Sequence, residues 1–278
     1  MNEIGYGAKD SSDNFNIDDN GSTSMRAQFS VVPFQQYIPR IFLFDNGPVE
    51  ATGLALNSFA RGAVGMSTIF LGPALLLLAE EAAKANCNDG DNNDTGTECS
   101  DGGRVFGMRP TSLLTNIGIF SGLLSSLLTP LFGSIVDHTP HRKAVGQGSA
   151  IILAIVKGIE IFVNQSTWFI VSVLQVFNFV IYNAYLCSVY AYTAELSTIP
   201  NEQTGYNSRF QQIHYVAMLI FLILVMVIST ILGTSDVGTA RVSQTLAFVV
   251  CTAVFGMSWK WFFRPRPALR EVPSGSTL

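Results

Sequence analysis

Six long apolar segments, separated by shorter polar stretches, dominate the chain from residue 54 onward. A helix needs about 20 mostly apolar residues to cross the roughly 30 Å hydrocarbon core of a bilayer. Each segment reaches that length, although polar residues interrupt the first and the fourth. The segments cover residues 54–79, 111–136, 144–163, 167–193, 211–233 and 242–263. This pattern predicts an all-α polytopic membrane protein with six transmembrane helices.

The sequence outside these segments divides the chain further. Residues 1–30 are rich in Asp, Asn, Ser and Gly and have no apolar signal-peptide core, which predicts a disordered tail. Residues 31–48 carry aromatics and prolines and form either an interfacial segment or an ordered linker. We therefore expect a cytosolic tail and approach segment at residues 1–50. A six-helix bundle follows at residues 51–265, with one long lumenal loop at 80–110. Residues 266–278 are expected to form a cytosolic tail or the start of a central linker.

Composition supports the membrane assignment and narrows the possible partners. The chain has 278 residues, of which 48% are hydrophobic and 13% charged, against about 25% charged in an average soluble domain. Its net charge is −4 and its acids cluster in the N-terminal segment and the first loop, so a lipid bilayer is an expected partner and nucleic acid is not. Because no metal-ligand spacing, phosphate-binding glycine loop or nucleophile–base set is visible, neither a cofactor nor an enzymatic activity is expected.

The distribution of basic residues predicts the orientation of the chain. Six spans place both termini and the even loops on one side of the membrane. The termini and even loops contain Lys9, Arg26, Arg40, Arg142, Lys143, Arg209, Lys260, Arg264, Arg266 and Arg270, whereas the odd loops contain Lys84, Arg104, Arg109 and Arg241. Since cytosolic loops are enriched in Lys and Arg, the termini are predicted to be cytosolic.

Glycosylation sequons and cysteines agree with this orientation. The sequons at Asn93 and Asn164 both fall in odd loops, on the predicted lumenal or extracellular side, although a third sequon at Asn20 lies in the predicted cytosolic tail. Cys87 and Cys99 flank the acidic first loop. An oxidising compartment would favour a disulfide between them, and two free thiols are the alternative.

The loop after the second span, GSIVDHTPHRK, resembles the signature loop of the major facilitator superfamily. The pattern G-x-x-x-D-x-x-x-x-[RK]-[RK] is matched by Gly133, Asp137, Arg142 and Lys143. We expect the glycine to permit close helix approach, the acid to accept hydrogen bonds from a helix N-terminus, and the basic pair to lie at the anionic leaflet. Such a loop can latch one conformation of a carrier, and an ordinary positively charged cytosolic loop is the alternative.

Within that superfamily the chain resembles the autophagy-related vacuolar amino-acid effluxers. GLALNSFARGA (53–63) is similar to their first-helix pattern, roughly G-W-A-x-Y-D-F-A-N-S-A, and IYNAYL (181–186) to a fourth-helix Tyr-Asn-x-x-Leu run. Residues 208–215 lie where those proteins enter helix five. The chain departs from the family at three places. Asn57-Ser58 replaces the family's Tyr-Asp, Arg61-Gly62 replaces its Asn-Ser, and His214 replaces its glycine before the helix-five tyrosine. The resemblance implies amino-acid efflux from a vacuole during autophagy, and a location in the vacuolar membrane.

The resemblance covers only the N-terminal half of such a carrier. Facilitators have two six-helix halves with the substrate held between them near the midplane. A second half or a second copy is therefore an expected partner, and a truncated gene model, a split carrier and a dimerising half remain open. Other possibilities are a facilitator for a sugar or organic anion, and a non-transporting six-helix membrane scaffold.

Polar residues within the spans are the candidates for solute binding, because ionisable groups in hydrocarbon are costly and often functional. Arg61 can either reach a substrate carboxylate or extend to the interface, and His214 is a titratable candidate in the fifth span. Lys157 and Glu160, spaced i, i+3, are expected to neutralise each other as a structural pair. A helical stripe in the fourth span is the best candidate for the substrate-facing surface: Gln175, Asn178, Tyr182, Tyr185 and Tyr192. For Gln175 and Asn178, hydrogen bonding between helices of the same half is the alternative.

Overall fold

The computed structural model of the chain describes residue 42, residues 48–88 and residues 103–265. These residues fold into helices and form no β-strand beyond an isolated bridge between Val105 and Met108. The helices are α1 (Val49–Asn88), α2 (Pro110–His138), α3 (Arg142–Glu160), α4 (Trp168–Ala194), α5 (Pro200–Leu232), α6 (Asp236–Val250), the π-helical turn η3 (Cys251–Phe255) and α7 (Gly256–Trp261). The predicted all-α class is confirmed for this part of the chain.

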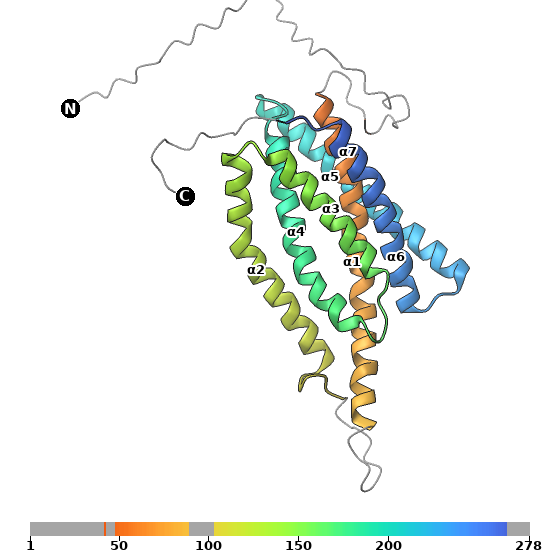
Figure 1. Ribbon diagram of the computed structural model, residues 1–278. Helices are drawn as coiled ribbons and strands as arrows, with labels where there is room; N and C mark the ends of the chain where they lie inside the picture. The colour runs from red at the N-terminus through yellow and green to blue at the C-terminus, as the bar shows by residue number, and fades with distance from the viewer. Residues whose placement is uncertain (1–41, 43–47, 89–102, 266–278) are drawn as a thin grey trace, which may run out of the picture.

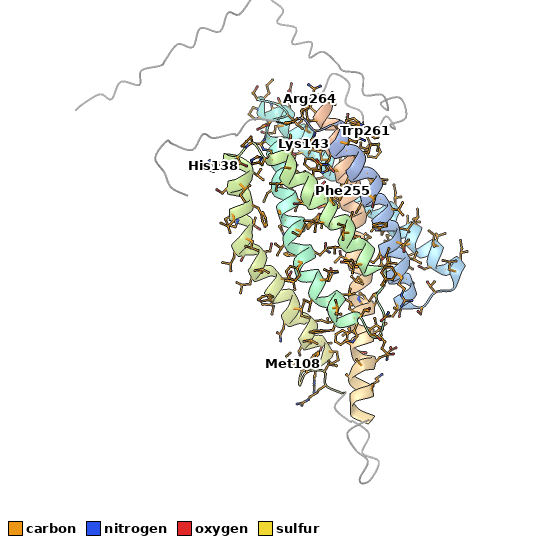
Figure 2. All side chains as sticks on the ribbon, in the orientation of Figure 1. Met108, His138, Lys143, Phe255, Trp261 and Arg264 are labelled. Carbon is orange, nitrogen blue, oxygen red and sulfur yellow. The ribbon has the colours of Figure 1, made fainter. Side chains whose placement is uncertain are left out.

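The helices run side by side and alternate in direction (Figure 1). The helices α6, η3 and α7 form one continuous rod, Asp236–Trp261. The turn between α2 and α3, marked by His138 and Lys143, lies at the same end of the bundle as Arg264, and Met108 lies at the opposite end (Figure 2). Successive connections therefore fall at opposite ends of the bundle.

Five helices are long and apolar enough to cross a membrane: α1, α2, α4, α5 and the α6–η3–α7 rod. The helix α3, with 19 residues, is long enough but does not qualify because it carries four charged residues, Arg142, Lys143, Lys157 and Glu160. Large apolar side chains remain exposed on the outer faces of α2 and α5, as a lipid environment requires. The fold is thus that of an integral, multi-pass membrane protein with five apolar helices long enough to span a bilayer. A sixth span through α3 stays a prediction.

Helix ends in the structure differ most from those expected at two places. The helix α1 continues through residues 80–88, into the predicted first loop, because EEAAKA consists of good helix formers. The helix α5 begins at Pro200 rather than at residue 211, since proline is favoured in the first turn and the following polar residues tolerate a helix outside hydrocarbon. It ends at Leu232, directly before Gly233, whose φ of 59° is in the left-handed region.

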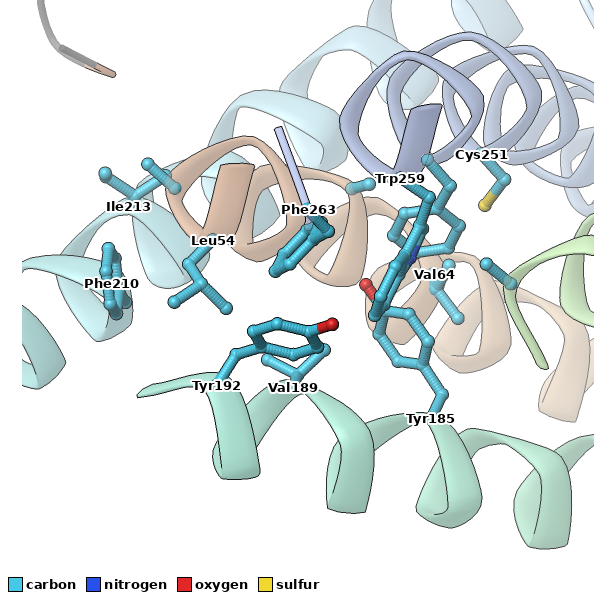
Figure 3. Packing of buried hydrophobic residues seen from close by; sticks show 14 of the residues in the cluster. Leu54, Val64, Tyr185, Val189, Tyr192, Phe210, Ile213, Cys251, Trp259 and Phe263 are labelled. Atoms are coloured by element: carbon cyan, nitrogen blue, oxygen red, sulfur yellow. The ribbon is translucent and has the colours of Figure 1, made fainter. Parts of the chain in front are cut away.

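An aromatic cluster forms part of the core (Figure 3), between α4 and the last rod, whose end lies beside the start of α1 (Figure 1). Trp259 stacks on Phe263 with ring centroids 4.2 Å apart, and Tyr192 meets Phe263 edge-on at 4.8 Å. Tyr185 packs against Phe255 at 5.0 Å. These rings come from α4 and from the segment that runs from η3 past the end of α7, so burial of large aromatic surfaces ties the last rod to α4.

The helices α1 and α5 approach each other closely at Gly62. A Cβ built there would lie 2.6 Å from the carbonyl oxygen of His214 and 2.8 Å from Cβ of Ala217. Only glycine leaves room for this contact, which is the usual way that small residues let membrane helices approach. The expected close approach at Gly133 is not found, since no heavy atom lies within 4 Å of a Cβ built at that position.

Candidate solute-binding site

A cavity of about 820 Å³ opens between α1, α2 and α4. Its volume falls in the range typical of small-molecule sites, about 300–1,000 Å³. Most of its lining is apolar, and the polar side chains that interrupt it are Thr68, Thr111, Thr115, Ser121, Ser172, Gln175, Asn178 and Tyr182. The cavity therefore combines an apolar surface with a small number of hydrogen-bonding groups, half of them on α4.

The structure divides the predicted stripe on α4 into two parts. Gln175, Asn178 and Tyr182 line the cavity. Tyr185 is fully buried in the core, where its hydroxyl donates to Oδ1 of Asn57 at 2.7 Å. Tyr192 is also fully buried and donates to the carbonyl oxygen of Arg264 at 2.8 Å. The assignment of Tyr185 to the substrate-facing surface is therefore wrong, because the aromatic cluster covers this half of the stripe.

A buried polar network lies directly behind the cavity wall. Nζ of Lys157 lies 2.9 Å from Oε2 of Glu160, and both side chains have no exposed surface. The ammonium group also donates to Oγ1 of Thr68 at 3.3 Å, and Nε2 of Gln175 donates to Oε1 of Glu160 at 2.6 Å. The predicted mutual neutralisation of Lys157 and Glu160 is confirmed, and the pair also connects α3 to cavity residues on α1 and α4.

Arg61 is a buried cation without a carboxylate partner among the described residues. Its side chain is 4% exposed, and its Nε has no hydrogen-bond partner there. The guanidinium carbon lies 5.8 Å from the ring centroid of Tyr190, and the charge is near enough to act on Tyr182 and His214. Tyr182 lines the cavity and Arg61 does not, so the charge of Arg61 lies close to the cavity without being on its surface.

His214 is half-buried on α5, close enough to Arg61 for that charge to act on it. Its ring contacts that of Tyr215 with centroids 5.4 Å apart, and its buried Nδ1 has no partner in the described part of the chain. His214 is not among the residues that line the cavity. The structure thus brings it near Arg61 without placing it on the cavity surface.

The signature loop is organised around Arg142. This side chain is 1% exposed and forms an ion pair with Glu195, with Nη1 and Oε1 2.6 Å apart. Its guanidinium lies over the ring of Tyr192 at 5.6 Å. Asp137 is exposed and Lys143 only half-buried, so of the motif's charged residues Arg142 alone is held in the bundle. Sequence reasoning missed Glu195, although an acid directly after the fourth span was the available signal.

Several predicted features lie outside the described residues. These include Cys99, so the disulfide with Cys87 stays a prediction, and the sequon at Asn93. Asn164 is described and lies in the turn between α3 and α4, where its Oδ1 accepts hydrogen bonds from the backbone N–H groups of Ser166 and Thr167 at 2.8 and 3.0 Å.

Comparisons of the chain with protein-family models, with curated proteins and with solved structures find no match. The resemblance to facilitators therefore rests on the sequence motifs alone. In the described part of the chain, no group of three or more His, Cys, Asp or Glu residues is arranged to hold a metal ion. The site is thus characterised by its shape, by the amide groups of Gln175 and Asn178, and by two buried cations near it, Lys157 and Arg61.

Proposed function

We propose that this protein carries small solutes across a membrane by alternating access, with the cavity between α1, α2 and α4 as part of the solute path. The observation that carries the proposal is Arg61, a buried cation that forms no ion pair among the described residues and whose charge acts on Tyr182 in the cavity wall. An uncompensated charge within a membrane bundle is costly. A solute carboxylate that reached Arg61 would offset this cost, which favours amino acids, and the motif resemblance favours their efflux from a vacuole.

Alternating access requires a second bundle against which the first can rock. We infer that a complementary half or a second copy supplies it, and that α3 forms the sixth span. Neutralisation of Lys157 by Glu160 supports this role for α3, because a paired charge is tolerated within a membrane far better than a single one. The termini are placed in the cytosol by loop charge, and protease digestion of terminally tagged protein in sealed vesicles checks that orientation.

Reconstitution at controlled density tests the transport proposal. Liposomes would receive either one copy or several copies of the purified chain, and uptake of a mixed pool of labelled amino acids would be measured. We expect saturable uptake only where two copies, or the chain and a supplied second half, share a vesicle. Uptake by verified monomers would reject the two-bundle mechanism. Absence of uptake in every arrangement would reject transport of this pool and favour a non-transporting scaffold.

Arg61→Gln is expected to reduce amino-acid uptake about tenfold or more, because a hydrogen bond to a charged group contributes about 1.5–3 kcal/mol. Initial uptake rates in the same liposomes measure the effect. Arg241→Gln is the matched control, since Arg241 is exposed and its Nε already donates to the carbonyl oxygen of Val163 at 2.8 Å. Equal rates for the wild type and Arg61→Gln would exclude Arg61 as the carboxylate site.

We also propose that the Arg142–Glu195 pair latches the end of α4 to the start of α3. Glu195→Gln leaves the buried guanidinium of Arg142 without its carboxylate, so it is expected to increase the population of conformers in which this end is open. Distances between spin labels on α2 and α4 would report those populations. Asp137→Asn, at an exposed position of the same motif, is the comparison variant. Unchanged distance distributions in Glu195→Gln would contradict the latch.

A further inference from the structure

We propose that Glu160, although it lies behind the cavity wall, determines whether the cavity accepts hydrogen-bond donors or acceptors, and that its charged form selects solutes with a primary ammonium group. Glu160 would act as a positioning residue, through Gln175 and Asn178. The inference rests on the proposed function, because it takes the cavity between α1, α2 and α4 as the solute site.

The charge of Glu160 sets the orientation of the Gln175 amide. An ionised carboxylate only accepts hydrogen bonds, and the ammonium group of a lysine only donates them. Lys157 occupies Oε2 of Glu160 at 2.9 Å. Gln175 must therefore present its NH₂ group to Oε1, which it does at 2.6 Å, and its own carbonyl oxygen must point away from Glu160.

The orientation of Gln175 in turn fixes that of Asn178. The carbonyl oxygen of Gln175 accepts a hydrogen bond from Nδ2 of Asn178 at 3.3 Å. The remaining polar atom of Asn178, Oδ1, is buried and has no partner in the described residues. Asn178 is 5% exposed and lines the cavity. The network thus leaves one unsatisfied acceptor, almost without exposed surface, on a residue that lines the cavity.

An unsatisfied buried acceptor favours a ligand that donates a hydrogen bond. Among ligand groups a primary ammonium is the strongest candidate, because its hydrogen bonds are charge-assisted and it has no acceptor that would meet the carbonyl oxygen. Hydroxyl oxygens of Thr68 and Ser172 line the same cavity and can accept its other hydrogens. The wall therefore matches a group with several donors.

Glu160→Gln is expected to reverse this relay. Lys157 would still require an acceptor, so the carbonyl oxygen of the substituted side chain would face Lys157 and its NH₂ group would face Gln175. Gln175 would then turn its NH₂ group toward Asn178. Asn178 would accept with Oδ1 and present Nδ2 to the cavity, which changes the wall from an acceptor to a donor.

Two probes of equal size and opposite polarity test the reversal. Benzylammonium and benzoate would be titrated by calorimetry against the full chain in lipid nanodiscs. We expect Glu160→Gln to lower the affinity ratio of benzylammonium to benzoate about tenfold or more, with tighter binding of benzoate. A purely structural role for Glu160 would weaken both probes together, and that result would overturn the inference.

Variants of the intervening amides provide the controls. Gln175→Met interrupts the relay, so adding Glu160→Gln to it should leave the affinity ratio unchanged. Gln244→Met removes another buried amide, which donates to the carbonyl oxygen of Ser67 at 3.0 Å and does not line the cavity. It should not alter the ratio. If Glu160→Gln does not fold, Asn178→Leu serves in its place and should weaken benzylammonium about tenfold while sparing benzoate.

The outcomes separate this inference from the proposed function. If the wild type binds neither probe, the cavity is not a solute site and the inference falls with that proposal. If the wild type binds but Glu160→Gln preserves the ratio, only the relay is rejected. Reversal of the preference in Glu160→Gln, with no further change in the Gln175→Met background, supports the relay.

Discussion

Replacing Lys157 with methionine is expected to destabilise the bundle by about 3–5 kcal/mol. The substitution leaves the carboxylate of Glu160 fully buried, with only the amide of Gln175 as a donor. Removing one partner of a buried ion pair is costly because the remaining charge keeps its desolvation penalty without the compensating attraction. Denaturant unfolding in detergent micelles, followed by tryptophan fluorescence, measures the effect.

The double variant Lys157→Met/Glu160→Met is expected to recover most of the lost stability. A pair of apolar residues of similar volume removes the desolvation cost together with the attraction, so its net effect is often small. Lys260→Met is the matched control, because Lys260 is exposed near the end of the last rod. Its Nζ lies over the ring of Trp261, 5.7 Å from the ring centroid. A double variant as unstable as Lys157→Met would contradict this explanation.

Gly62→Ala is expected to destabilise the bundle by about 1–3 kcal/mol through overpacking. The added Cβ would meet the backbone oxygen of His214 at 2.6 Å and Cβ of Ala217 at 2.8 Å. Neither atom is the end of a flexible side chain, so α1 and α5 would have to separate. The same unfolding measurement applies, and cysteine cross-linking between the two helices would report the separation.

Gly65→Ala provides the control for Gly62→Ala, one turn along the same helix. A Cβ at Gly65 meets no heavy atom within 4 Å. Alanine has the higher helix propensity, by about 0.8–1.0 kcal/mol, so this substitution should be neutral or stabilising. Equal destabilisation by both substitutions would show that the α1–α5 contact is not as close as described.

The chemistry of α3 connects stability with the proposed function. Lys157 and Glu160 keep this helix from qualifying as an apolar span, yet they hold Thr68 and Gln175 at the cavity. A pair that served stability alone would need no amide chain leading from it to the cavity wall. The proposed selectivity of the cavity and the stability of the bundle therefore depend on the same two side chains.

Much of the fold could be predicted from the apolar segments. Backbone polar groups in hydrocarbon must be satisfied within their own segment, so long apolar runs predict helices. Five of these helices have the expected apolar length, and the i, i+3 spacing of Lys157 and Glu160 correctly predicted their ion pair. Helical spacing also placed Gln175, Asn178 and Tyr182 on one side of α4, where they line the cavity.

Only the tertiary structure decided what covers each helical face. The spacing that groups Tyr185 with Tyr182 says nothing of the aromatic cluster that buries Tyr185. Similarly, the loop motif predicted close packing at Gly133, whereas a close contact, between α1 and α5, is found at Gly62. The motif also gave no ionic partner for Arg142. Periodicity determines which residues of one helix share a side, but burial, ion pairing and close approach depend on residues distant in sequence, and those were brought together by folding.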